Sequence, residues 1–145
     1  LRRIIQTSFG HLPVEIYEKV PPDKMPEIYA KANIGLMPLF TDEANLPWVE
    51  SKSPTKLFEY MAMKMIPVCQ SIGEAPCILE HRKNGFLFRD QKDFLEILRY
   101  LLDEYWKLNH VRESAFETVY DNYRLEILGD NLSSILERNF PWLIK

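Results

Sequence analysis

The stretch that decides the fold covers residues 53–69 and reads SPTKLFEYMAMKMIPVC. Serine is favoured just before a helix and proline at its first position, so Ser53-Pro54 predicts a helix start. Apolar side chains then recur at helical spacing, which predicts a helix with one buried face up to about Met63. The short apolar run at 66–69 predicts a strand. A helix followed closely by a buried strand is typical of an α/β fold.

The same two kinds of pattern continue on both sides of this stretch. Strands are predicted at 14–20, 34–39 and 86–88, and helices at 23–32, 75–80, 90–105, 110–122 and 125–138. Asp23 is expected to cap the helix that it opens. Residues 40–52 are expected to form a long polar loop, a kind of segment that is often functional.

The alternation of strands and helices defines the expected fold class. It predicts an α/β domain with a three-layer, Rossmann-like parallel sheet, helices on both faces and further helices at the C-terminal end. We expect one domain over residues 1–145, with its β/α core at 14–102 and C-terminal helices at 110–138. In such sheets the ligand lies beyond the carboxyl ends of the strands. Gly35, inside a predicted strand, is expected to mark the close approach of another backbone.

Composition excludes several classes of protein. The 18 basic and 21 acidic residues give a net charge of −3, which argues against binding nucleic acid through its phosphates and against a polybasic membrane anchor. No apolar run approaches the ~20 residues of a transmembrane helix. Two cysteines cannot build a disulfide framework or a four-ligand zinc site, and we expect no metal and a reducing, cytoplasmic compartment. No G-x-G sequence occurs, so a Gly-rich dinucleotide fingerprint is absent.

The helix that follows Ser53 carries the residues with the clearest chemistry. Free amides at a helix N-terminus attract anions, and Lys56 adds a full positive charge in the first turn. Glu59 lies three residues after Lys56 and four after Thr55, so the three share one helix face. This pattern suits a nucleotide, with phosphates at the amides and ribose hydroxyls at the carboxylate. The alternative is an amphipathic helix with a surface Lys–Glu pair.

Four segments carry a resemblance to a known family. They are residues 25–38, 53–62, 66–68 and 84–87. In their order and spacing the sequence resembles the C-terminal nucleotide-sugar-binding domain of GT-B glycosyltransferases of the retaining group 1 type, over roughly residues 14–102. The resemblance implies one half of a GT-B fold, truncated on its N-terminal side. It implies transfer of a sugar from a nucleotide diphosphate sugar to an acceptor, with retention of the anomeric configuration.

The resemblance also implies roles for individual residues. Glu59 matches the glutamate that binds the ribose hydroxyls, and Val20 matches the position where the base is read through the backbone. The turn that faces the diphosphate corresponds to the helix start at Ser53, with the amides of Thr55, Lys56 and Leu57.

A second glutamate of the family, eight positions before the ribose-binding one, contacts the donor sugar. Ser51 occupies that position here, and Glu50 is its neighbour. These two residues are the candidates for a catalytic role. The departure leaves two alternatives, a register shifted by one residue or a subgroup that does without this glutamate.

The remaining expectations concern partners and setting. We expect a nucleotide-sugar donor, an acceptor that is a sugar or lipid-linked glycan, a missing N-terminal domain, and no cofactor or nucleic acid. The chain alone is expected to be inactive, with a possible dimer built on a sheet edge and the apolar C-terminal tail. Residues 1–9 are expected to supply a substitute strand.

The setting implied by the family is the cytoplasm, peripheral to an inner membrane, in bacterial surface polysaccharide synthesis. Alternatives are a non-catalytic GT-B-like interaction domain, a nucleotide-sugar epimerase, or a phosphorylase.

Overall fold

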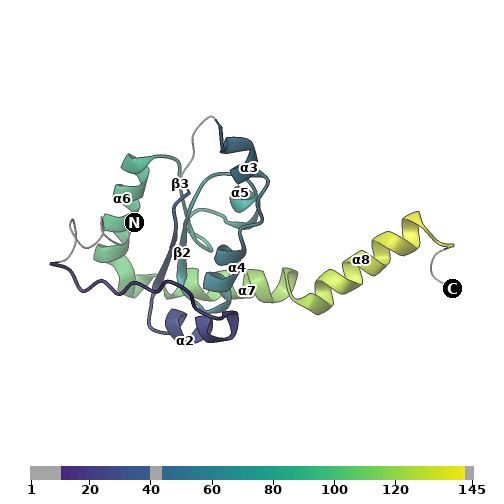
Figure 1. The fold of residues 1–145 in the computed structure, drawn as a ribbon, viewed down its shortest axis with the longest axis horizontal. Helices are drawn as coiled ribbons and strands as arrows, with labels where there is room; N and C mark the ends of the chain where they lie inside the picture. Colours follow the sequence, from purple (N-terminus) through teal and green to yellow (C-terminus); the bar gives the residue numbers. More distant parts are fainter. Residues whose placement is uncertain (1–10, 40–43, 143–145) are drawn as a thin grey trace.

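The computed structural model describes residues 11–39 and 44–142 of the 145-residue chain. Within these residues three parallel strands form one sheet in the order β1 (Ile34–Met37), β2 (Ile66–Gln70) and β3 (Phe86–Phe88). The strand β2 is central (Figure 1). Parallel neighbours need a crossover connection, and both connections contain helices. The predicted parallel α/β sheet is therefore confirmed.

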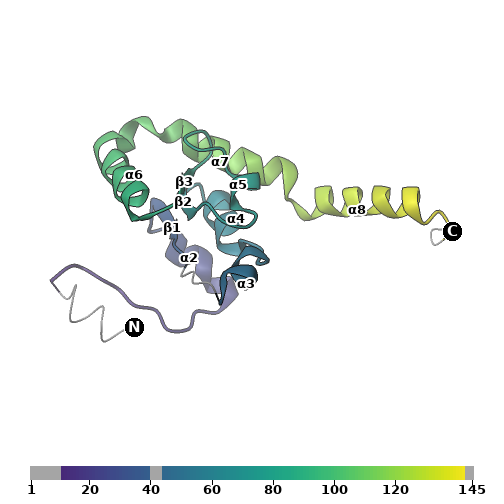
Figure 2. The same ribbon diagram turned by 90° about the horizontal axis from the view of Figure 1, so that it is seen from above.

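Helices account for most of the remaining described chain. They are η1 (Pro22–Lys24), α2 (Met25–Tyr29), α3 (Leu46–Glu50), α4 (Thr55–Ala62), α5 (Ala75–Ile78), α6 (Gln91–Glu104), η2 (Tyr105–Lys107), α7 (Asn109–Asn122) and α8 (Leu125–Asn139). Figure 2 shows α6 on one side of the strands, and α4 and α5 on the other. The predicted arrangement, with helices on both faces of the sheet, is confirmed.

Alternate residues of the strands supply two hydrophobic cores, because successive strand side chains point to opposite faces. On one face Val68 of β2 and Phe86 of β3 pack in one cluster with Leu101 of α6. On the other face Cys69 of β2 packs with Leu57 of α4. The near-continuous burial of β2 follows from this covering on both sides.

The helix α7 belongs to the core and is not an appendage to it. Its Val111 is buried in the first cluster and its Ala115 in the second. The buried amide of Asn84 ties the turn before β3 to the same helix, since its Nδ2 donates to Thr118 Oγ1 at 3.0 Å and to Ile78 O at 3.1 Å. The C-terminal helices therefore begin inside the domain core.

Gly35 in β1 lies directly beneath the aromatic ring of Tyr60 in α4. A Cβ atom added at Gly35 would lie 2.3 Å from the nearest atoms of that ring. The expected close approach at Gly35 exists, but a side chain makes it and not another backbone. Tyr60 meets Tyr29 of α2 edge to face, with 5.5 Å between ring centroids. The absence of a side chain at residue 35 thus sets how closely α4 approaches the sheet.

Pro67 lies in the central strand, where proline is rare because it cannot donate to the hydrogen-bond ladder. The N–H of Ile66 donates to Asn33 O at 2.9 Å on the β1 side, so the backbone of residue 67 faces the β3 side. Pairing with β3 begins at Val68, one residue later. The missing N–H of Pro67 therefore falls before the second ladder starts. Its ring packs on Gly85, where an added Cβ would lie 2.8 Å from Pro67 Cγ.

The strand predicted at 14–20 is wrong, because this segment has no regular structure. Val14 and Tyr17 are 46% and 48% exposed, so the alternating side chains cover no core. An alternating pattern yields a strand only where a neighbouring strand supplies hydrogen-bond partners. Among the residues that the structure describes, no strand pairs with this segment. The substitute strand predicted at 1–9 lies outside the described residues.

Some predicted helix starts also differ from the structure. Asp23 lies inside η1 and does not cap α2, which begins at Met25. The helix α4 begins at Thr55, with Pro54 in the cap position and no side-chain cap, so the predicted role of Ser53 as the cap is wrong. The reason is a turn in which the N–H of Thr55 donates to Ser53 O at 2.9 Å. Part of the predicted loop at 40–52 is the short helix α3, while residues 40–43 lie outside the described part.

Elsewhere the local signals agree with the structure. The strand predicted at 86–88 has the same bounds as β3. Asp90 opens α6, and its Oδ1 accepts a hydrogen bond from the N–H of Asp93 at 2.9 Å. The helices α7 and α8 begin and end within one residue of their predicted bounds.

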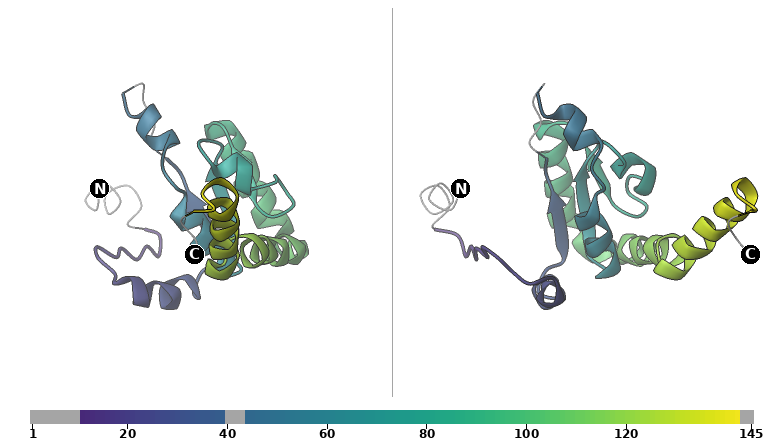
Figure 3. Two further views of the ribbon diagram at one scale, coloured as in Figure 1. Left: turned by 90° about the vertical axis from the view of Figure 1, so that its right-hand side faces the viewer. Right: turned by 45° about the vertical axis from the view of Figure 1, so that its right-hand side comes forward.

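The helix α8 extends away from the body of the domain (Figures 1 and 3). None of its residues is buried. Its apolar residues recur at intervals of three or four and are exposed: Leu125, Leu128, Leu132 and Ile135. Phe140 and Trp142 beyond it are also exposed, as the prediction of an apolar C-terminal surface requires. Among the described helices, none is long and apolar enough to span a lipid bilayer.

Replacing Gly35 with alanine is expected to destabilise the domain, because the new methyl group collides with the ring of Tyr60. Overpacking of this kind costs about 1–3 kcal/mol. Urea denaturation of the purified chain measures the loss. Gly129→Ala is the matched control, since nothing lies within 4 Å of a Cβ at that helical position. The control is expected to unfold at the same or a slightly higher urea concentration. Equal midpoints for wild type and Gly35→Ala would contradict the packing argument.

Candidate functional site

The predicted pair Lys56 and Glu59 forms a three-residue cluster with Tyr29, which the chain supplies from α2. Lys56 Nζ donates to Glu59 Oε2 at 2.8 Å and to Tyr29 Oη at 2.9 Å. The hydroxyl of Tyr29 donates to the same Glu59 Oε2 at 2.5 Å. Tyr29 is buried, whereas the two charged residues are partly exposed. Tyr29 lies 27 positions before Lys56 and 30 positions before Glu59 in the sequence.

The cluster keeps both charges in place at neutral pH. Burial alone would raise the pKa of Glu59, but the hydrogen bonds from Lys56 and Tyr29 outweigh it and hold the pKa below its ordinary value. The hydrogen bonds to Glu59 and Tyr29 raise the pKa of Lys56. Burial, followed by the hydrogen bond to Glu59, raises the pKa of the Tyr29 phenol. Glu59 is therefore an ionised acceptor and Lys56 a charged donor.

A pocket of ≈ 350 Å³ opens beside this cluster, between α4 and the segment that contains α2. Its lining includes Val20, Tyr29, Lys56 and Glu59. Val20 thus meets Glu59 in one pocket although no strand carries it there. The helix α2 leads into the amino end of β1, so this pocket opens along the side of the sheet. The ligand of a parallel α/β sheet is expected beyond the carboxyl ends of the strands, but the pocket that contains Glu59 does not lie there.

A second pocket, of ≈ 210 Å³, lies at the amino end of α4. Its lining includes Ser53, Thr55 and Lys56 together with Leu39, which follows β1, and Ile72, which follows β2. This pocket does lie beyond the carboxyl ends of the strands, where ligands of parallel sheets bind. Lys56 lines both pockets and is the charged residue that connects them.

Fewer backbone N–H groups are free at the start of α4 than the sequence predicts. The N–H of Thr55 donates to Ser53 O at 2.9 Å, and the N–H of Leu57 donates to Pro54 O at 2.8 Å. Of the three N–H groups predicted to face an anion, those of Thr55 and Leu57 therefore already donate to backbone carbonyls. The side chain of Leu57 is fully buried in the core. An anion at this helix end depends mainly on Lys56.

The structure does not bring Glu50 and Ser51 to this site. Both lie at the end of α3, and neither lines the two pockets that contain Lys56. Ser51 Oγ donates to Trp48 O at 3.0 Å, within its own helix. The α3 backbone is held close to the loop after β2, because Glu50 O would lie 2.8 Å from a Cβ at Gly73. A catalytic role for Glu50 or Ser51 stays a prediction.

A parallel sheet with helices on both faces defines a Rossmann-like α/β domain, and the Lys–Glu cluster lies on the helix between two of its strands. A sequence model of the family described as glycosyl transferases group 1 matches residues 1–104. The chain belongs to this family.

One solved structure with the same fold is the C-terminal domain of a glycosyl transferase group 1 family protein (LpcC) from Francisella tularensis. The TM-score is 0.61 and the sequence identity 16%, so the likeness concerns the fold alone. The similar region covers 86% of this chain and 60% of that chain. No curated protein matches the chain.

Tyr29→Phe is expected to raise the pKa of Glu59, because the variant removes one of the two hydrogen bonds that stabilise the carboxylate. The phenylalanine ring keeps the edge-to-face contact with Tyr60, so the fold is retained. A pH titration of the Glu59 side-chain carboxyl by NMR measures the change. Tyr17→Phe is the control, since Tyr17 donates to Glu15 and not to Glu59. An unchanged pKa in Tyr29→Phe would show that Lys56 alone holds the carboxylate.

Proposed function

We propose that this domain binds the nucleotide diphosphate sugar donor of a retaining glycosyltransferase. The observation that supports the proposal best is the position of Lys56, which lines the pocket beyond the strands and also the pocket of Glu59. A nucleoside diphosphate has two parts that suit these two pockets. Its phosphates need a cation at the helix start, and its ribose needs a hydrogen-bond acceptor one helical turn away.

One carboxylate oxygen of Glu59 accepts hydrogen bonds within the chain, and the other is free to accept one from a ligand. Its Oε2 accepts from both Lys56 and Tyr29, whereas no described residue donates to Oε1. An ionised carboxylate oxygen with a free lone pair is suited to accept a hydrogen bond from a ribose hydroxyl. The base would then extend along the pocket toward Val20, which lines the same space. Thr55 and Ser53 lie on the phosphate side.

The complete reaction needs groups beyond this chain. We assign the acceptor, a sugar or lipid-linked glycan, to the surface between this domain and an N-terminal partner domain. Glu50 and Ser51 are the candidates for contact with the donor sugar, and they would have to move from the end of α3 to reach it. The proposal requires no metal or cofactor. Its setting would be the cytoplasm, at the surface of an inner membrane, in bacterial surface polysaccharide synthesis.

Glu59→Gln is expected to weaken the binding of nucleoside diphosphates. A hydrogen bond to a charged group contributes about 1.5–3 kcal/mol, so the loss is roughly 10–150-fold in Kd. NMR titration of the chain with UDP, GDP and ADP measures it, with the 2′,3′-dideoxy analogues as probes of the ribose contact. The wild-type chain should discriminate against the dideoxy forms, and Glu59→Gln should not.

Glu27→Gln is the matched control for this experiment. Glu27 forms the same i,i+3 ion pair, with Lys24 at 3.0 Å, but it does not line either pocket. Its substitution should leave the nucleotide Kd within twofold of wild type. If both variants bind equally well, Glu59 does not contact the ribose and the assignment of the donor site is wrong.

The exposed stripe on α8 favours a second candidate, a GT-B-like domain that acts through protein contacts. Leu125, Leu128, Leu132 and Ile135 form a face that no described residue buries. In an enzyme this face would pack on the partner domain. In the absence of that partner, two copies of the chain can bury it against each other.

The 145-residue chain is expected to self-associate through this stripe. Leu132→Glu places a charge in the apolar face and should reduce the mass measured by light scattering to that of a monomer. Ser133→Glu, one residue away, leaves Leu132 in place and is the control. A wild-type chain that is monomeric at high concentration would contradict the expected self-association.

A further inference from the structure

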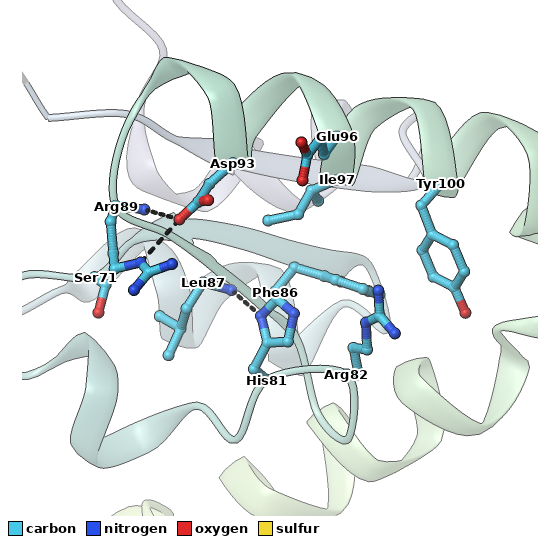
Figure 4. A pocket seen from close by; sticks show the side chains of 10 residues that line it. All are labelled: Ser71, His81, Arg82, Phe86, Leu87, Arg89, Asp93, Glu96, Ile97 and Tyr100. Carbon is cyan, nitrogen blue, oxygen red and sulfur yellow. Dashed lines mark hydrogen bonds and ion pairs between the residues drawn. The ribbon is translucent and has the colours of Figure 1, made fainter.

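A third pocket lies on the far side of the sheet from the Lys56–Glu59 cluster. It has a volume of ≈ 340 Å³ and lies between β3, the turn at 81–85 and the amino-terminal half of α6 (Figure 4). Its polar lining includes His81, Arg82, Arg89, Asp93 and Glu96. None of these residues lines the two pockets that contain Lys56, so the pocket is independent of the proposed donor site.

Arg82 has a positive φ angle, a backbone conformation that is uncommon for residues other than glycine. Its φ is 69°, in the left-handed region where glycine and asparagine are favoured. The guanidinium lies over the ring of Tyr100 in α6, with 5.0 Å from Cζ to the ring centroid. Among the residues that the structure describes, no carboxylate forms an ion pair with Arg82. The cation–π contact with Tyr100 holds the guanidinium at this position, and no hydrogen bond or ion pair of the described residues uses its N–H donors.

His81 adds a second donor whose direction is fixed by the backbone. The N–H of Leu87 donates to His81 Nδ1 at 3.1 Å. A neutral imidazole that accepts at Nδ1 must carry its proton on Nε2. Figure 4 shows Nε2 on the side of the ring that is turned toward Arg82. Burial, and then the positive charge of Arg82, lower the pKa of His81, so the ring is neutral at pH 7.

The acidic residues of the pocket already have cationic partners. Asp93 Oδ2 accepts from Arg89 Nε at 2.9 Å, and Glu96 lies 3.9 Å from Lys92. Arg89 is likewise committed to Asp93. The one cation of this set without an acidic partner among the described residues is therefore the Arg82 guanidinium, and the neutral His81 offers its Nε2–H beside it on the side formed by the turn at 81–85.

We propose that His81 and Arg82 form a binding site for an oxyanion, the phosphate or carboxylate group of a small ligand. Arg82 would hold two oxygens through its planar fork, and the Nε2–H of His81 would donate to one of them. The strained turn has a function in this arrangement, because it aims the guanidinium at the pocket from a position that glycine would normally occupy. A bound anion would also offset the repulsion that disfavours a protonated His81.

The test is an NMR titration of the full chain with three probes: inorganic phosphate, glucose 1-phosphate and acetate. The readout is the backbone amides of residues 81–85 and the pKa of the His81 ring, so phosphate that binds near Lys56 is not counted. We expect saturable shifts at this turn and a rise in the pKa of His81. Stronger binding of glucose 1-phosphate than of inorganic phosphate would identify a sugar phosphate as the ligand, and stronger binding of acetate a carboxylate.

Arg82→Gly removes the guanidinium without straining the turn, because glycine suits a positive φ. It should weaken binding roughly tenfold or more, as expected for the loss of charge-assisted hydrogen bonds. Arg82→Lys keeps the charge but lacks the planar fork, and it should bind with intermediate affinity. Lys83→Gln is the matched control, since Lys83 lies in the same turn but is paired with Glu80 at 2.7 Å. Equal losses in Arg82→Gly and Lys83→Gln, or no saturable shift at residues 81–85, would overturn the proposal.

Discussion

The ring of Tyr60 lying on the bare backbone of Gly35 is the contact on which the site depends. Any side chain at residue 35 would separate α4 from β1. Tyr60 in turn supports Tyr29 through an edge-to-face contact, and Tyr29 donates to Glu59. The absence of a Cβ at Gly35 in β1 therefore determines where the carboxylate of Glu59 lies on α4.

The cluster on α4 combines features that an exposed helical Lys–Glu pair lacks. Exposed pairs of this spacing contribute little to stability, typically well under 1 kcal/mol. Here the hydroxyl of Tyr29 binds the same carboxylate oxygen as Lys56, so the two charged side chains have one preferred geometry. A preorganised acceptor next to a preorganised cation loses less conformational entropy when it meets a ligand. The arrangement is therefore the kind that the proposed donor site requires.

The sequence predicts those parts of the fold whose signals are local. The strand β3, the start of α6 at Asp90 and the helices α7 and α8 agree with their patterns, because turns, helix starts and periodicity act over a few residues. The segment at 14–20 fails because a strand requires a partner that the pattern itself does not supply. The spacing of Lys56 and Glu59 on one helix is enough to predict that their side chains lie together. The sequence does not identify Tyr29 as a site residue, because 30 positions separate it from Glu59. It does not identify Arg82 either, because its place beside His81 in a pocket depends on the fold.

Pro67 has a consequence for the fidelity of folding. The parallel ladder between β2 and β3 uses the N–H of every second residue of β2, including that of Ser71, which donates to Phe88 O at 2.7 Å. A misaligned β3, displaced by two positions toward the amino end of β2, would need a donor at residue 67, and proline has none. A shift by two positions keeps every side chain on its own face of the sheet, so the hydrophobic pattern alone does not oppose it. A residue that is unfavourable for strand formation in general thus removes one competing structure while leaving the native one intact.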